Sequence, residues 1–389
     1  MRICFGWYAD TAVSQAKTST PMRLSHLDVP RFGREEGFAE NRGFIVVGEA
    51  IHQMFHHDRA KSAYVDIRRS GNAAVSPEVI AADVNRRFDV LVLGMSYEIA
   101  PETDCSYTVE VLKSIEIPVV VLGLSVVDEA LSLSSLHPSV VELLRYLDAN
   151  ASIFGVRAQR TQRWLATHGF ENAEPLGCPS LHKQFHSSPR ISYERQKNVP
   201  ISIATGGYLL RDKDRGRLLC EVFAGEAATY ILQEDIYDIA DGTHLESEQR
   251  SGSVEYDVEY IAGMAKEIHG IEAPFVKYHL FNDMPSWREC LARHALYIGD
   301  RFHGAVAAIQ AGLPAVVICK DVRSLELCDF YDIPFLSLEH AAQLRANAII
   351  DGFIRPDVGA RMRDTIAFRH EVLSDRLRSV GLSLLANIE

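Results

Sequence analysis

The 389-residue sequence lacks several features that would place it in a familiar functional class. It has no run of about 20 apolar residues, so no segment is expected to span a membrane. The first residues become polar too quickly for a secretory signal peptide. Its 40 Lys and Arg residues face 52 Asp and Glu residues, giving a net charge of −12. This balance argues against a general nucleic-acid binder, because a phosphate backbone requires a basic surface.

The cysteines form no Cys-x-x-Cys pair, and their number is odd: Cys4, Cys105, Cys178, Cys220, Cys290, Cys319 and Cys328. This usage is typical of a reducing cytoplasm and indicates neither a disulfide framework nor a zinc site. The sequence also contains no Walker loop, no Gly-x-Ser-x-Gly elbow and no His-Glu-x-x-His motif. We therefore expect a cytoplasmic protein that needs no metal, and a peripheral contact with the inner face of the membrane stays open.

Short apolar runs and helical segments alternate along most of the chain. In the first half, strands are predicted at 89–95 and 119–122 with helices between them, a pattern typical of a doubly wound parallel sheet. The polar stretch 183–198 has no periodicity and is interpreted as a linker. We predict an α/β protein with two Rossmann-like domains facing a cleft, an N-terminal one over 1–190 and a C-terminal one over 191–389.

Four helices of this pattern are predicted with definite boundaries or roles. Segment 43–55 is expected to be amphipathic, 217–224 to follow a basic loop, and 254–269 to follow an acidic excursion. In 363–385, apolar residues recur at roughly helical intervals. We expect this last helix to cross back to the first domain.

The most informative stretch is 295–321, a predicted strand, turn, helix and strand. Asp300 follows the first strand and is a suitable N-terminal cap for the helix. Arg301 and His303 then lie at the carboxyl edge of a parallel strand beside a helix N-terminus, where backbone N–H groups favour an anion. Arginine adds a bidentate partner for phosphate or carboxylate, and histidine can donate a proton near neutral pH. The open alternative is a surface ion-pair arginine and a near-core histidine.

Other arginines are candidates for the same kind of anion binding. Arg157 and Arg160 are predicted at a strand end and in the first turn of the next helix, where a cation is unfavourable unless an anion binds. Arg211 belongs to a basic loop that follows Gly206 and Gly207, where an acceptor phosphate could bind. For each arginine, a solvated surface charge is the alternative.

The motif RFHG at 301–304, followed by a small-residue helix and Gly-Leu-Pro, resembles the C-terminal signature of the polysaccharide pyruvyl transferase family. Asp321, Arg323 and Glu326 continue the resemblance, and VRAQRT at 156–161 is similar to the family's Val-Arg-x-x-x-Ser/Thr element. The resemblance implies a GT-B-like architecture. It also implies transfer of pyruvate from phosphoenolpyruvate to two hydroxyls of a sugar, as a ketal, in capsule or exopolysaccharide biosynthesis.

The resemblance also implies roles for individual residues. His303 would be the general acid that protonates the enol methylene carbon, and Arg301 with Arg157 would bind the phosphate and carboxylate of the donor. Asp321 and Glu326 would hold Arg301 and Arg323 in place, and positioning of the sugar hydroxyls is the alternative role. The remaining candidates for substrate binding are Phe302, Gly304, Arg160, Arg211 and Asn41, the last because an Asn and a Gly open the first helix of the family's N-terminal domain. Apart from phosphoenolpyruvate as donor substrate, no cofactor is expected.

One departure from the family keeps alternatives open. Family members often carry a glycine-rich loop after the strand predicted at 89–95, whereas GMSYEIAPETD here holds one glycine. A GT-B glycosyltransferase using a nucleotide sugar is the leading alternative, although Arg-Phe-His-Gly is not its usual pattern. A non-catalytic scaffold is the third, and the intact Arg301 and His303 argue against it. The sequence leaves open the sugar, the hydroxyl pair, a lipid carrier for the acceptor and the oligomeric state.

Overall fold

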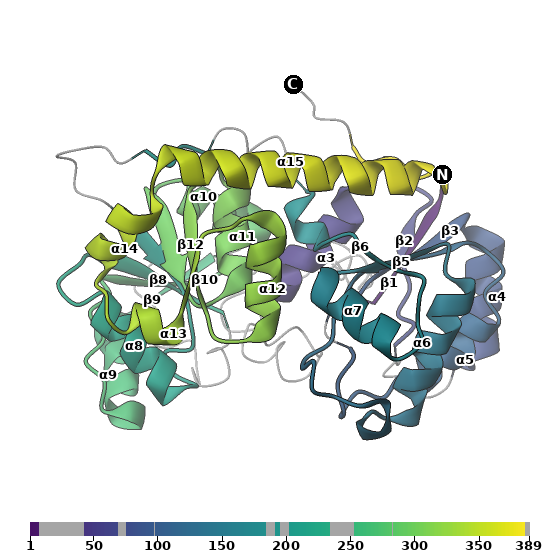
Figure 1. Ribbon diagram of the computed structural model, residues 1–389, viewed down its shortest axis with the longest axis horizontal. Helices are drawn as coiled ribbons and strands as arrows, with labels where there is room; N and C mark the ends of the chain where they lie inside the picture. The colour runs from purple at the N-terminus through teal and green to yellow at the C-terminus, as the bar shows by residue number, and fades with distance from the viewer. Residues whose placement is uncertain are drawn as a thin grey trace.

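The computed structural model contains two separate parallel sheets, each covered by helices, with one long helix lying along both (Figure 1). We call the units around these sheets the first and second domains. The described residues are 1–7, 43–68, 75–96, 98–183, 191–194, 202–233, 253–281 and 283–385.

The first domain is built on a six-stranded sheet in the order β2-β1-β3-β4-β5-β6, in which every neighbouring pair is parallel. Its strands are β1 (Ile3–Gly6), β2 (Ala63–Tyr64), β3 (Val90–Gly94), β4 (Val119–Leu124), β5 (Ile153–Val156) and β6 (Ala173–Pro175). Its helices are α3 (Gly43–Gln53), α4 (Pro77–Arg87), α5 (Ser106–Lys113), α6 (Pro138–Asn150) and α7 (Gln159–Thr167), with short 3₁₀ turns η1 (Leu133–Ser135) and η2 (Pro179–Leu181). Alternate residues of β3 enter two different apolar clusters, since successive side chains of a strand point to opposite faces.

The second domain has a seven-stranded sheet in the order β13-β12-β11-β7-β8-β10-β9, parallel except for β9. Its strands are β7 (Ile203–Thr205), β8 (Ala228–Leu232), β9 (Ser253–Tyr256), β10 (Lys277–Phe281), β11 (Leu296–Gly299), β12 (Ala315–Cys319) and β13 (Phe335–Ser337). Its helices are α8 (Lys213–Val222), α9 (Val258–His269), α10 (Met284–Leu291), α11 (Phe302–Gln310), α12 (Val322–Tyr331), α13 (Leu338–Ala341), α14 (Ala346–Phe353) and α15 (Pro356–Arg378). The predicted pair of Rossmann-like domains is thus confirmed.

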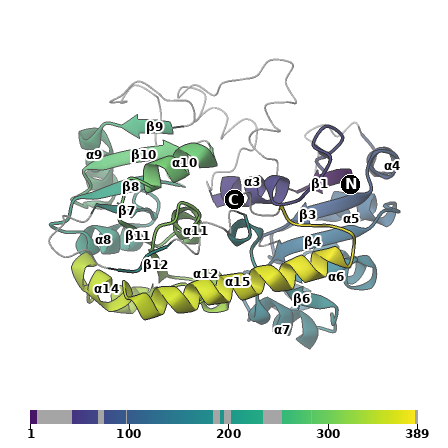
Figure 2. The ribbon, with the colours of Figure 1, turned by 90° about the horizontal axis from the view of Figure 1, so that it is seen from above.

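Helix α15 joins the two domains, as predicted. It begins beside α14 in the second domain and ends beside the first sheet (Figures 1 and 2). Near its end, Arg376 Nε donates to both oxygens of Glu174 at 2.7 and 2.8 Å, and its Nη2 donates to the carbonyl of Ser152 at 3.2 Å. The two sheets are built from 3–175 and from 203–337, so the boundary at 190 stays a prediction.

Helix α3 is buried on most sides, which corrects the prediction of an amphipathic helix. One apolar cluster runs from its Val46 and Val47 through the first sheet into the second domain. Its Glu49 is also buried, and the carboxylate accepts two hydrogen bonds from Arg288 of α10 at 2.7 and 2.9 Å. Lys183 Nζ lies 2.7 Å from the same carboxylate. The helix therefore lies between the domains, where neither face is free for solvent.

Three predicted helix ranges in the second domain are wrong. Helix α15 spans Pro356–Arg378 and not 363–385, and capping residues explain the other two. Helix α8 begins at Lys213 instead of 217, because the Asp212 side chain accepts a hydrogen bond from Arg215 N at its first turn. Residues 253–256 form β9 and pair antiparallel with β10. Helix α9 then starts after Asp257, which caps it through Tyr260 N.

In the described part of the chain, no helix has both the length and the apolarity needed to cross a bilayer.

Candidate active site

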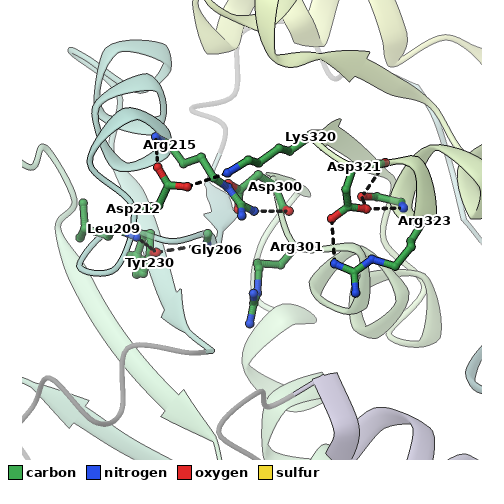
Figure 3. Close-up of polar contacts among 12 residues, drawn as sticks. Gly206, Leu209, Asp212, Arg215, Tyr230, Asp300, Arg301, Lys320, Asp321 and Arg323 are labelled. Atoms are coloured by element: carbon green, nitrogen blue, oxygen red, sulfur yellow. Dashed lines mark hydrogen bonds and ion pairs between the residues drawn. The ribbon is translucent and has the colours of Figure 1, made fainter. Parts of the chain in front are cut away.

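The RFHG motif lies where strand β11 turns into helix α11. Arg301 is the N-cap residue of this helix and makes no side-chain cap. Asp300, the predicted cap, instead accepts a hydrogen bond from Arg215 Nε at 2.5 Å, while Arg215 Nη2 donates to the Asp300 carbonyl at 3.2 Å (Figure 3). The prediction for Asp300 is wrong because a buried guanidinium from α8 engages its carboxylate.

His303 occupies the first turn of α11. Its ring is half-buried, and its Nε2 atom is buried without a hydrogen-bond partner in the part of the chain that the structure describes. Burial and the positive charges of Arg157, Arg301 and Arg323 lower the pKa of His303 well below its usual value. In the protein without ligand the imidazole is therefore neutral near pH 7, and a negative charge placed among the arginines would raise its pKa.

Arg157 comes from the first domain, directly after β5. It is 4% exposed, its Nε donates to the Gly123 carbonyl at 3.0 Å, and its Nη2 donates to Ser96 Oγ at 2.6 Å. Arg301 is 5% exposed. Neither arginine is the solvated surface charge that the sequence left open. The structure brings these two predicted residues from opposite domains to the surroundings of His303.

A carboxylate of the protein occupies the N-terminus of α7, where the sequence suggested an anionic ligand. Glu326 of α12 is 3% exposed, and its carboxylate accepts from Thr161 N at 2.9 Å and from Thr161 Oγ1 at 3.4 Å. Glu326 thus bridges the domains. The prediction that it holds Arg301 or Arg323 is wrong, because its carboxylate is engaged by Thr161. Arg160 lies 3.6 Å from Glu129 in a partly exposed ion pair, and its binding role stays a prediction.

Asp321 and Arg323 lie on the second-domain side of the site. Asp321 caps α12 by accepting from Ser324 N at 2.8 Å, and Arg323 Nη2 donates to its carboxylate at 3.2 Å (Figure 3). The prediction that Asp321 holds Arg323 agrees with this contact. Its effect is to keep a third guanidinium near the turn that carries Arg301.

Sequence comparison identifies the family of this site. The model of the polysaccharide pyruvyl transferase family matches residues 55–318, which include both the Arg157 element and the RFHG motif. The chain belongs to this family. A search of curated proteins gives no significant match.

The similar solved structures named here are distant in sequence. UDP-GlcNAc 2-epimerase from Neisseria meningitidis, bound to UDP-GlcNAc, is 12% identical with a TM-score of 0.49, covering 97% of this chain and 100% of that one. UDP-GlcNAc 2-epimerase from Methanocaldococcus jannaschii is 11% identical with a TM-score of 0.45, covering 94% and 99%. MurG from Acinetobacter baumannii is 9% identical with a TM-score of 0.40, covering 97% and 100%.

The remaining predicted site residues of this pyruvyl transferase family member lie in varied places. Gly304 is tightly packed, since a Cβ atom there would lie 2.2 Å from the Tyr297 hydroxyl oxygen. Phe302 is buried beside it, and Arg211 is exposed in the turn before α8. Asn41 lies outside the described residues. Substrate-binding roles for these four stay predictions.

Sequence reasoning missed an acidic residue close to Arg157. Glu98 is buried, and its carboxylate accepts from Trp7 Nε1 at 2.6 Å and from Ser96 N at 2.5 Å. Burial raises the pKa of this carboxyl group, and the positive charge of Arg157 opposes that shift. Its only signal in the sequence is its place just after a buried strand.

In the described residues, no group of three His, Cys, Asp or Glu side chains is arranged as a metal site.

Proposed function

We propose that this polysaccharide pyruvyl transferase family member transfers pyruvate from phosphoenolpyruvate to two hydroxyls of a saccharide, forming a ketal. The observation that carries the proposal is that the positive charges of Arg157, Arg301 and Arg323 all act on His303, whose Nε2 atom is buried. The donor would bind among the arginines, with its enol carbon facing the imidazole. The saccharide acceptor would approach from the first domain.

The charge of the donor matches this grouping. A phosphate monoester carries about −1.5 to −2 charges at pH 7, and the carboxylate of phosphoenolpyruvate adds one more. The guanidiniums of Arg157, Arg301 and Arg323 carry three positive charges, of which that of Arg323 is shared with the Asp321 carboxylate. Guanidinium geometry suits both phosphate and carboxylate. The N-terminus of α11 adds backbone N–H groups and a favourable dipole. The site therefore favours a small ligand with several negative charges.

The same charges would switch the protonation of His303. Without donor, the surrounding arginines keep the pKa of the imidazole low. A bound trianion would compensate those arginines, so His303 would take up a proton when the donor is present. A general acid that is charged only beside its substrate avoids a stable, unproductive imidazolium. We propose His303 as that acid.

The reaction balances with this one acid. His303 gives a proton to the methylene carbon of phosphoenolpyruvate, which becomes the methyl group, and positive charge develops at the neighbouring carbon. One sugar hydroxyl attacks that carbon and returns its proton to His303. The bond between the carbon and the phosphate oxygen then breaks, and the second hydroxyl closes the ketal ring. The proton of the second hydroxyl leaves with inorganic phosphate.

The His303→Ala variant tests the proposed acid. In a strain lacking its own copy of the gene, the variant should lower the pyruvate content of the polysaccharide through a loss of turnover of about a hundredfold or more. Binding of phosphoenolpyruvate to the purified variant should persist, because the arginines remain. As a matched control, the exposed His340→Ala should behave like the wild type. Full pyruvylation by His303→Ala would refute the assignment of His303.

A further inference from the structure

The loop after β7 is fixed from several sides. The Asp300 backbone N–H donates to the carbonyl of Gly206 at 3.1 Å. The hydroxyl oxygen of Tyr230 accepts hydrogen bonds from Gly207 N at 3.1 Å and from Leu209 N at 3.0 Å (Figure 3). These two amides flank Tyr208, so both neighbours of this residue are anchored to the same hydroxyl. The loop holds Tyr208 in a defined place.

Gly207 allows this loop to approach the site so closely. A Cβ atom at Gly207 would lie 2.1 Å from Leu219 Cδ1 and 2.6 Å from Asp300 Oδ1. Any larger residue would therefore push the loop away from Asp300, the residue that precedes Arg301. The adjacent glycines, which the sequence suggested as a ligand-binding element, bring the loop backbone against the turn of the RFHG motif.

The Tyr208 ring contacts two guanidinium groups. The Cζ atom of Arg215 is 3.3 Å from the ring centroid, and the Cζ atom of Arg301 is 4.1 Å from it. Both distances are within the range of cation–π attraction, which is strongest where water is excluded. Tyr208 is half-buried, while Arg215 and Arg301 are buried. One aromatic ring thus contacts both cations in a site largely removed from water.

A second layer fixes the Arg215 side of the stack. Arg215 Nε and Nη2 donate to the side chain and carbonyl of Asp300, as described above. Asp212, which caps the helix carrying Arg215, also accepts from Lys320 Nζ at 2.8 Å (Figure 3). Arg215 is thus held through Asp300, and Tyr208 lies against its guanidinium. Tyr208 therefore contacts Arg301 and also a fixed, charge-balanced pair formed by Arg215 and Asp300.

We propose that Tyr208 is a positioning residue that orients the Arg301 guanidinium for the acidic group of the donor. The proposal rests on the proposed function, because it assigns a purpose to the orientation of Arg301. It also gives the glycine-containing loop a role different from the one suggested by the sequence. The loop acts through Tyr208 on Arg301 and does not need Arg211 to bind a phosphate.

A double-mutant cycle tests the coupling between the two residues. Tyr208→Phe and Tyr208→Leu are made in the wild type and in Arg301→Gln, and calorimetry gives the dissociation constant for phosphoenolpyruvate. Tyr208→Leu should weaken binding by about tenfold in the wild type and by less than about twofold in Arg301→Gln, because the stacked partner is already lost. Tyr208→Phe keeps the ring that contacts Arg301 and removes the hydroxyl, which interacts with Arg215. Binding should stay within about twofold of the wild type, because the contact with Arg301 is made by the ring.

The matched control is Tyr146→Leu, a half-buried tyrosine in α6 of the first domain, which should leave donor affinity unchanged. An unchanged affinity in Tyr208→Leu would overturn the proposal. An equal loss in the wild-type and Arg301→Gln backgrounds would do the same, since the residue would then act independently of Arg301.

A second measurement separates this proposal from the proposed function. NMR relaxation of the Arg301 Nε–H group in the ligand-free protein reports the order of its side chain. Tyr208→Leu should lower that order and Tyr208→Phe should preserve it, whether or not phosphoenolpyruvate is the donor. If the wild type fails to bind phosphoenolpyruvate, the proposed function fails alone and the NMR result still decides the role of Tyr208. Unchanged order in Tyr208→Leu would contradict that role.

Discussion

Replacing Glu326 with alanine should weaken the contact between the domains. The substitution leaves Thr161 N buried and without its acceptor, which costs about 1–3 kcal/mol. It also removes the carboxylate from the N-terminus of α7, where Ala158 provides no side-chain cap. Burial raises the pKa of Glu326 and so disfavours its charge, and the interaction of the charged form with the helix dipole contributes about 0.3–1 kcal/mol. The bond from Thr161 Oγ1 is long at 3.4 Å and adds little. The free energy of unfolding should therefore fall by about 1.3–4 kcal/mol.

Urea denaturation, followed by the fluorescence of the tryptophans, measures this loss. Glu326→Gln keeps an oxygen that can accept from Thr161 N but removes the charge, so it should lose less than half as much stability as Glu326→Ala. The exposed Glu371→Ala on α15 is the control and should change stability by less than about 0.5 kcal/mol. A Glu326→Ala variant as stable as this control would refute the account of the bridge.

Two further predictions concern buried histidine and glycine. Burial, together with the charge of the neighbouring His370, lowers the pKa of His182 to about 3. Between about pH 6.5 and 3 only the unfolded chain takes up this proton, so stability should fall as the pH drops through this window. His182→Gln should flatten the pH dependence of urea denaturation over this window, and His340→Gln should not. Gly304→Ala should lower the free energy of unfolding by about 2 kcal/mol or more, because the added methyl group would overlap Tyr297. Gly263 lies in α9 with open space around it, so Gly263→Ala should raise the free energy of unfolding by up to about 1 kcal/mol. Thermal melts measure both changes.

The parallel architecture could be predicted because it depends on local patterns. Continuous apolar runs such as β12 and the glycine and proline residues at helix ends fix strand and helix positions within a few residues. The turn that carries Arg301 and His303 is likewise local, so its place at the carboxyl edge of β11 followed from the sequence. The family resemblance then added the expectation that Arg157 belongs to the same site.

The partners of the charged residues could not be predicted from the sequence. Asp300 looked like a helix cap, but its carboxylate meets Arg215, which is 85 residues away. Glu326 is 165 residues from Thr161 and pairs with it only because the domains are packed together. Local patterns carry no information about such contacts. The burial of α3 was missed for the same reason, since α10 and α11 of the second domain pack against it.

Calorimetric titration with phosphoenolpyruvate, and separately with UDP, tests the central claim most directly. The account predicts that phosphoenolpyruvate binds the wild type and that Arg301→Gln weakens binding by about tenfold or more, the loss of one charged hydrogen-bonding group. The exposed Arg361→Gln on α15 should bind like the wild type. Binding of UDP without phosphoenolpyruvate, or equal donor affinity in Arg301→Gln, would contradict it.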